Sequence, residues 1–176
     1  MQLRAANTDD VAAIQVIYAY HVRHGLSSFE TEPPHYNEMR QRFASVVDAG
    51  FPYLVAVDSG EVLGYAYANH FRTRPAYRYA VEDSIYVRAD ATGKRIGTLL
   101  LNALIERCAA SGLRQMLAVI GDSGNTASIA VHRRCGFEHV GTMRSIGRKF
   151  DRWVDVVVMQ RALGEGAATA PAAEAR

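Results

Sequence analysis

The stretch AVEDSIYVRADATGKRIGT, residues 80–98, carries the clearest pattern in the chain. Residues 81–87 alternate and are rich in β-branched and aromatic side chains, which is typical of a mostly buried strand. A polar break follows, then the glycine-bracketed turn 93–97, then an apolar run from Thr98 that predicts a helix. Unpaired backbone N–H groups and the positive end of the helix dipole converge at such a turn. The stretch therefore predicts an anion-binding site between a strand and a helix.

A carboxylate, Glu82, lies on the predicted strand beside this anion site. Partial burial among apolar strands raises the pKa of a carboxylate, which suits a general base. The simpler interpretation is an edge-strand glutamate paired with a nearby arginine, and spacing alone slightly favours it. Acyl transfer from a phosphate-bearing carrier would explain the carboxylate and the anion site together.

These residues resemble the core motif of the GNAT superfamily of N-acetyltransferases: a strand glutamate, then Gly-Lys-Arg-Ile-Gly, then an apolar helix. Asn125 to Ser128 and the Gly136-Phe137 pair resemble its second signature, an Asn-x-x-Ser helix followed by a strand. Within the superfamily the chain resembles the phosphinothricin and methionine sulfoximine acetyltransferase group. The similarity covers nearly all of residues 2–162 and rests on RPAYRYAVEDSIYV, AVIGDSGNTAS, HRRCGF and GRKFDRWVDVVVMQRAL.

The resemblance implies that acetyl-CoA is the co-substrate and that its pantetheine arm adds to the sheet like an extra strand. An N–H near Val87 would face the thioester oxygen, and Asn125 would contact the pantetheine arm. Glu82 would be the base, and His132 stands where many relatives carry a tyrosine that protonates the thiolate. A lone helical histidine is more often structural, and Asn125 and Ser128 by themselves indicate a helix N-terminus. The implied cofactor-binding residues are Ile85, Tyr86, Val87, Gly93, Lys94, Arg95, Ile96, Gly97, Thr98, Asn125 and Ser128.

The chain departs from the superfamily pattern at two positions of the turn. The superfamily prefers Arg or Gln where Thr92 stands, which removes a side-chain phosphate donor. It prefers Gly where Arg95 stands, which puts a charged side chain where a backbone must approach closely. Arg95 either replaces the lost charge or obstructs the site.

Two loops are the expected substrate-recognition elements, one around Phe29 and one over residues 72–78. Arginines and an aromatic ring beside Glu82 would suit a small amino acid that carries a carboxylate and a second polar group. The competing interpretation is that these are solvent-exposed loop arginines. The predicted substrate-binding residues are Phe29, Arg72, Thr73, Arg74 and Tyr77.

Composition excludes several other classes. A net charge of +2 over 176 residues is too small to argue for nucleic acid. No apolar run approaches the roughly 20 residues that span a bilayer, and the N-terminus does not resemble a signal peptide. Cys108 and Cys135 lack the spacing of a zinc site, so we expect no metal. Both are expected to be buried, reduced thiols, which favours a cytoplasmic location.

The order of elements predicts an α+β fold in one domain, residues 1–162, with a mixed, mostly antiparallel sheet flanked by helices. A helix pattern follows Asp10 and another begins near Tyr36, and the strands 53–58 and 62–71 flank a hairpin turn. Further strands are expected over 116–120, from Phe137 and over 153–160, with a short helix over 125–135. Residues 163–176, rich in Ala and Gly, are expected to form a flexible tail.

The leading functional hypothesis is N-acetylation of a small amino-acid-like amine. Acetylation of protein N-termini or lysines is an alternative, although it usually needs an open peptide groove and the two long loops favour a closed pocket. A non-catalytic acyl-CoA-binding domain is the third possibility, raised by Arg95 and opposed by Glu82. The basic and aromatic stretch 147–153 resembles a segment near the partner subunit in the family, which implies a homodimer.

Overall fold

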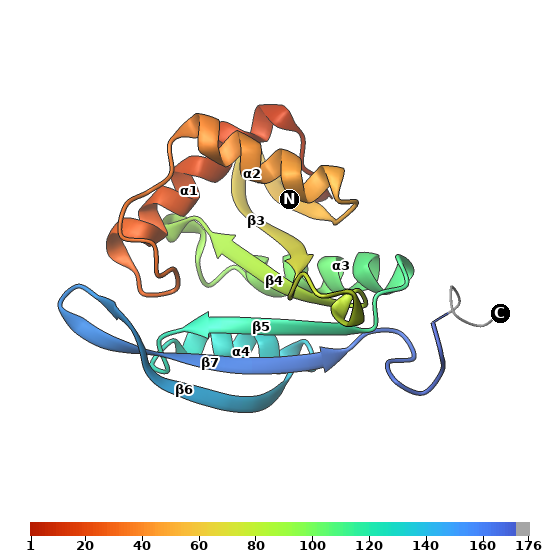
Figure 1. The fold of residues 1–176 in the computed structure, drawn as a ribbon. Coiled ribbons are helices and arrows are strands. Elements are labelled where there is room, and N and C mark those ends of the chain that lie inside the picture. Colours follow the sequence, from red (N-terminus) through yellow and green to blue (C-terminus); the bar gives the residue numbers. More distant parts are fainter. Residues whose placement is uncertain (172–176) are drawn as a thin grey trace.

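Seven strands form one twisted sheet, and helices cover both of its faces (Figure 1). The structure, a computed structural model, describes residues 1–171. The described elements are β1 (Gln2–Ala5), α1 (Val11–His24), α2 (Tyr36–Asp48), β2 (Tyr53–Asp58), β3 (Glu61–His70), β4 (Ala80–Val87), α3 (Ile96–Ala110), β5 (Gln115–Gly121), α4 (Thr126–Arg134), β6 (Glu138–Lys149) and β7 (Arg152–Ala162).

The strand order is β1-β2-β3-β4-β5-β7-β6. Every neighbouring pair is antiparallel except β4 and β5, which run parallel and are connected through α3. The predicted fold class, a mixed and mostly antiparallel sheet flanked by helices, is therefore confirmed. Within the described residues, no helix is long and apolar enough to cross a membrane.

Strand alternation divides the core into two layers. Leu54 and Ala56 of β2 point toward α3 and join the larger apolar cluster, which includes the buried face of that helix. Tyr53 and Val55 point the other way and pack with α1 and α2. Both faces of the central strands are thus covered, which explains why these strands are nearly continuous apolar runs.

Local signals placed most helices and turns correctly. Asn7 and Asp10 form a capping box at the short 3₁₀ helix that leads into α1, and Gly25 follows the last residue of α1. Ser59 and Gly60 both have positive φ in the predicted hairpin turn between β2 and β3. The helix predicted from Thr98 begins two residues earlier, at Ile96, so the glycine-bracketed turn is shorter than expected. Cys108 and Cys135 are buried free thiols, as predicted.

The expected flexible tail needs correction over its first residues. Leu163 is 1% exposed and belongs to the larger apolar cluster. The Arg114 guanidinium then holds the following turn by donating to the Gly166 and Ala170 carbonyls and to the Thr169 hydroxyl. The burial of Leu163 and the hydrogen bonds of Arg114 hold the start of this alanine-rich segment against the domain, although its composition offers few apolar side chains. Residues 172–176 of the expected tail lie outside the described residues.

Candidate active site

A cavity opens where the two parallel strands at the centre of the sheet part. Paired residues run from Ala80 and Gln115 to Asp83 and Ala118, and there the pairing ends. Strand β4 nevertheless continues to Val87 along β3, and β5 continues to Gly121 along β7. The facing edges beyond Asp83 and Ala118 therefore lack strand partners. A cavity of about 1010 Å³ and an adjoining polar one of about 150 Å³ occupy this divergence.

The N-terminus of α3 closes one side of the larger cavity. Gly93 has φ +78° and Arg95 has φ +61°, and α3 begins at the next residue. The Leu99 N–H makes the first bond of this helix, to the Arg95 carbonyl. The amides of Ile96, Gly97 and Thr98 thus precede the first helical bond and meet the cavity at the positive end of the dipole.

The two departures from the superfamily pattern have physical explanations here. The Thr92 hydroxyl donates to the Ala89 carbonyl at 3.1 Å, so it stabilises the preceding turn. Arg95 adopts the left-handed conformation that glycine adopts without cost, at an expense of about 1 kcal/mol. Its side chain lines the larger cavity, whereas Lys94 is exposed and does not line it.

Alternation along β4 gives the site two chemically different sides. Val81, Ile85 and Val87 pack on the α3 side, and Asp83 shares that side because its carboxylate meets His132 of α4. Glu82, Ser84 and Tyr86 point to the α1 side, where Tyr86 packs edge-on against Tyr18 at 5.0 Å between ring centres. Residues from both sides line the smaller polar cavity.

Glu82 is a partly buried carboxylate with a raised pKa. Burial is the main cause of the rise, and the neighbouring charge of Asp83 adds to it. In the sheet, Glu82 pairs with Asn69 on β3 and Leu117 on β5. It therefore lies one residue before the last paired position of β4 and β5. The side chain lines the polar cavity, which makes it accessible to a small molecule there.

His132 and Asp83 form a buried ion pair on the opposite side. The Asp83 carboxylate lies 3.1 Å from His132 Nε2, and His132 Nδ1 donates to the Ser128 carbonyl at 2.8 Å. The two side chains are only 5% and 2% exposed. Burial lowers the pKa of His132, but the hydrogen bond and charge of Asp83 outweigh it, and the net shift is upward. Both ring nitrogens are therefore already engaged. Among the described residues, the second Asp83 oxygen is buried without a hydrogen-bond partner.

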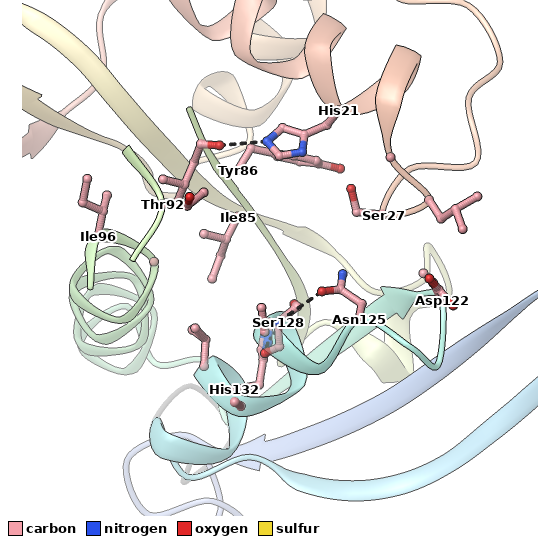
Figure 2. Close-up of a pocket in the computed structure, with 18 of the residues that line it drawn as sticks. His21, Ser27, Ile85, Tyr86, Thr92, Ile96, Asp122, Asn125, Ser128 and His132 are labelled. Atoms are coloured by element: carbon pink, nitrogen blue, oxygen red, sulfur yellow. Dashed lines mark hydrogen bonds between the residues drawn. The ribbon is translucent and has the colours of Figure 1, made fainter. Parts of the chain in front are cut away.

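Two other polar groups fix the walls of the larger cavity (Figure 2). Asn125 caps α4 by accepting from the Ser128 N–H at 3.2 Å, which is the structural role that its sequence position indicates. His21 of α1 lies 2.8 Å from the Val87 carbonyl, and because a carbonyl only accepts, His21 Nε2 is the donor. Burial lowers the pKa of His21, consistent with a neutral ring. His21 therefore anchors the end of β4 where the sheet edge is open.

The structure brings together most of the predicted cofactor residues and leaves the predicted substrate residues apart. All of the former except Lys94 line the larger cavity, joined by Arg134 and Arg152, which add positive charge. The latter line neither cavity: the segment around Pro75–Tyr77 is exposed, and the Arg72 guanidinium lies 5.2 Å from the Phe71 ring centre. This segment nevertheless leads directly into β4, which begins at Ala80, two residues before Glu82.

Sequence reasoning missed several cavity residues. His21, His24, Leu26 and Ser27 come from the end of α1 and the following loop, and Asp83 and Ser84 from β4 itself. The strand pattern contained the signal for Asp83, because a charged residue at an inward position of a buried strand needs a partner. His21 carried no such signal, since its helix position depends on how α1 crosses the sheet.

The site thus combines a parallel strand pair that parts, a helix N-terminus beside the gap, and a carboxylate on the other face of the strand, as the resemblance to the GNAT superfamily implies. Comparison with known families agrees: residues 3–158 match the acetyltransferase (GNAT) domain. The chain belongs to the GNAT acetyltransferase family.

Individual relatives with named activities or solved structures are similar to the chain over most of its length. The chain is 53% identical to phosphinothricin N-acetyltransferase of Alcaligenes faecalis, over 96% of this chain and 86% of that protein. It is 43% identical to the L-methionine sulfoximine/L-methionine sulfone acetyltransferase of Pseudomonas aeruginosa, over 90% of this chain and 92% of that protein. A phosphinothricin acetyltransferase from Sinorhizobium meliloti, solved in complex with AcCoA, superimposes with a TM-score of 0.95 at 48% identity, covering 98% of this chain and 94% of that one.

The His132–Asp83 pair predicts a pH-dependent contribution to stability. Because the folded pKa of His132 lies above its ordinary 6.5, the contribution is complete below that value and is lost as pH rises through the folded pKa. Replacing His132 with Gln should lower the free energy of unfolding by about 3 kcal/mol near pH 6 and by less near pH 9. Urea unfolding across this range measures it, with the exposed His35→Gln as control. A His132→Gln deficit that is constant with pH would contradict a charged pair.

Proposed function

We propose that this protein transfers the acetyl group of acetyl-CoA to the amine of a small amino-acid-like substrate of the phosphinothricin, methionine sulfoximine or methionine sulfone type. The observation that carries the proposal is the parting of β4 and β5, with the N-terminus of α3 on one side and Glu82 on the other. The names of the relatives agree with the same substrate class.

Acetyl-CoA fits the α3 side of the site. The unpaired amides of 96–98 and the Arg95 guanidinium suit a pyrophosphate, which is a dianion that helix N-termini bind readily. The open backbone edge of Ile85 to Val87 suits the amide groups of a pantetheine arm. The Asn125 amide supplies a further polar contact, since its oxygen is occupied by the helix cap and its nitrogen is not. We assign the thioester to the gap between β4 and β5.

The amine substrate fits the α1 side, where Glu82 lines the polar cavity. Glu82 accepts a proton from the ammonium group, directly or through a water. The free amine attacks the thioester carbonyl carbon, the carbonyl oxygen becomes an oxyanion, and the Val87 N–H is the proposed donor that stabilises it. Collapse of this intermediate breaks the C–S bond, releasing the N-acetyl product and the thiolate of CoA. Nitrogen loses two protons in all: Glu82 takes the first from the ammonium before attack and passes it to solvent, and it then accepts the second from the nitrogen of the tetrahedral intermediate, while the thiolate takes up a proton from solvent after release.

His132 is the proposed partner of the leaving thiolate. Its imidazolium lies at the wall of the cavity, and its positive charge favours a developing thiolate there. Protonating the sulfur would require His132 to give up one of its two hydrogen bonds. The geometry therefore supports electrostatic stabilisation by His132 more directly than proton donation.

Arg72 and Arg74 are the proposed ligands for the substrate carboxylate. Phe29 and Tyr77 would flank the side chain of the substrate, and Thr73 would add a hydroxyl. Since these residues lie outside the two cavities, the segment 71–79 must approach Glu82 when substrate binds. A bidentate guanidinium clamp on the carboxylate would then hold the adjacent amine in place for attack.

We further propose that the protein works as a homodimer in the cytoplasm. Strand β6 is at the edge of the sheet, and Ile146, Phe150 and Trp153 of its hairpin with β7 are more than half exposed. An exposed edge with large apolar side chains is typical of an interaction surface. Two free, buried thiols suit a reducing compartment.

The carboxylate clamp predicts strong discrimination between amino acids and simple amines. Wild-type kcat/KM for phosphinothricin should exceed that for its decarboxylated amine by about 30- to 150-fold, the value of one charge-assisted bidentate contact. Arg72→Ala and Arg74→Ala should shrink this ratio, and Arg107→Ala on the exposed side of α3 should not. Free thiol release from acetyl-CoA is the assay, with an N-terminal peptide as a third substrate. Equal turnover of acid and amine would exclude the clamp. A preference for the peptide would instead favour a protein acetyltransferase. Binding of acetyl-CoA without turnover of any amine would favour a non-catalytic binding domain.

The base assignment predicts a large loss of rate in Glu82→Gln, which keeps the shape and removes the proton acceptor. We expect kcat to fall by roughly 10²–10⁴. Because burial raises the pKa of Glu82, activity of the wild type should decline on the acidic side at a pH above the ordinary 4.5, and the variant should lack this limb. Glu106→Gln on the surface of α3 is the matched control. A near-normal rate with an unshifted pH profile would remove Glu82 from the mechanism.

The dimer predicts a molecular mass near twice that of the chain in light scattering at micromolar concentration. Trp153→Glu should reduce the mass to that of the monomer, because a charge would be buried at the contact. The equally exposed Val16 on α1 provides the control, as Val16→Glu. A wild-type monomer with full activity would contradict the proposal.

A further inference from the structure

The segment 26–30 between α1 and α2, here called the amine-side loop, lies at the junction of the two cavities. Leu26 and Ser27 line the larger cavity, and Ser27 also lines the polar one beside Glu82. A short irregular loop without strand or helix partners needs other contacts to hold one position. The position of this loop determines the shape of the amine side of the site.

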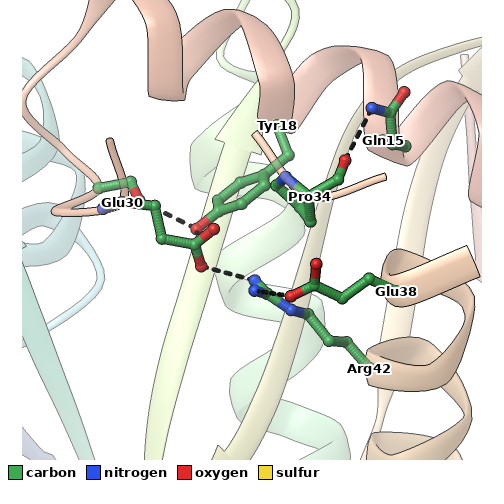
Figure 3. A network of polar contacts seen from close by, with 7 residues as sticks. Gln15, Tyr18, Glu30, Pro34, Glu38 and Arg42 are labelled. Carbon is green, nitrogen blue, oxygen red and sulfur yellow. Dashed lines mark hydrogen bonds and ion pairs between the residues drawn. The ribbon is translucent and has the colours of Figure 1, made fainter. Parts of the chain in front are cut away.

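Side chains from the two N-terminal helices hold one flank of the loop (Figure 3). The Tyr18 hydroxyl bonds to the buried Ser28 hydroxyl at 2.9 Å and donates to Glu30 Oε1 at 3.0 Å. Arg42 donates to Glu30 at 2.6 Å and also pairs with Glu38 one turn earlier in α2. This flank therefore ties the loop to α1 and α2 together.

The β6–β7 hairpin holds the opposite flank through Lys149. This lysine is 3% exposed, and its ammonium donates to the Ser28 carbonyl at 2.7 Å. The same ammonium lies 5.1 Å from the Phe150 ring centre. Burying an ammonium group is costly, and the hydrogen bond to the Ser28 carbonyl offsets part of that cost. The residues are 121 positions apart in sequence, so the bond is a long-range tie between hairpin and loop.

Two glycines on the same flank allow the loop to pack this closely. A Cβ at Gly147 of β6 would lie 2.2 Å from the Phe29 ring, so the ring rests on the bare backbone of the hairpin. A Cβ at Gly121, the last residue of β5, would lie 2.3 Å from the Leu26 carbonyl. Real Cβ atoms do not approach other atoms so closely. Loop, β5 and hairpin are therefore fitted to one another at these two points.

We propose that Gly147 and Lys149 are specificity-determining positions for the amine substrate, acting through the amine-side loop. Gly147 sets where the Phe29 ring lies, and Lys149 sets the height of Ser28 above the cavity. Neither residue lines the cavities, so both are positioning residues. The inference rests on the proposed function, because it takes the amine to bind on the Glu82 side.

The test compares Gly147→Ala with Gly141→Ala, the same change in the same strand where an added Cβ meets nothing within 4 Å. Gly147→Ala should displace Phe29, raise KM for phosphinothricin by about 5- to 30-fold and change the phosphinothricin to methionine sulfone ratio of kcat/KM by at least about threefold. KM for acetyl-CoA should stay within about twofold. Gly141→Ala should match the wild type. A general loss of folded enzyme would lower the apparent kcat/KM for phosphinothricin and for methionine sulfone by the same factor, and the ratio of the two would not change.

Lys149→Met provides an independent test that adds no bulk. Arg148→Met is its neighbour and control, since Arg148 is exposed and pairs with Asp151 in the hairpin turn. Lys149→Met should shift the same substrate ratio and speed amide hydrogen exchange of residues 26–30, while Arg148→Met should do neither. If both Gly147→Ala and Lys149→Met keep the wild-type ratio, the inference is overturned. If the wild type acetylates none of these amines, the proposed function fails instead.

Discussion

The parting of β4 from β5 is the constraint on which the site depends. A parallel pair that stayed together to its ends would satisfy its own backbone groups and leave nothing for a ligand. Here the pairing ends at Asp83 and Ala118 while each strand continues along its antiparallel neighbour. The polar edges are kept apart because β3 and β7 hold the two strands from outside. A ligand that donates and accepts like a peptide can then complete the sheet.

The same divergence lets one strand present two kinds of chemistry. Odd-numbered residues of β4 face α3, and even-numbered residues face α1 and α2 on the other side. Asp83 and Glu82 are adjacent carboxylates, yet one is locked to His132 and the other is directed into a polar cavity. Their roles are separated by the pleat of the strand rather than by distance. Of these two carboxylates, Asp83 therefore has a structural role and Glu82 is the candidate general base.

Local patterns predicted much of this arrangement, and long-range packing determined the rest. The strand–turn–helix of 80–98 could be predicted because alternation, glycines and an apolar helix signal are all local. The sequence indicated only that a buried Asp83 needs a partner. It did not identify that partner as His132, which lies 49 positions away. The amine-side loop was identified through Phe29, but its supports, Lys149 and Gly147, lie on a hairpin that only the folded sheet brings close. Residues 163–170 were misjudged because composition does not reveal a single buried Leu163 or the reach of Arg114.

The left-handed backbone of Arg95 has a consequence for how freely this turn can vary. Arg95 carries a long cationic side chain in the left-handed conformation, and α3 still begins at the next residue. Gly93 also has a positive φ and Ile96 is 1% exposed, so the turn keeps its backbone shape without a glycine at position 95. The charge of the turn and its shape are consequently independent variables. A substitution at position 95 can therefore change the charge beside the cavity while the start of α3 stays in place.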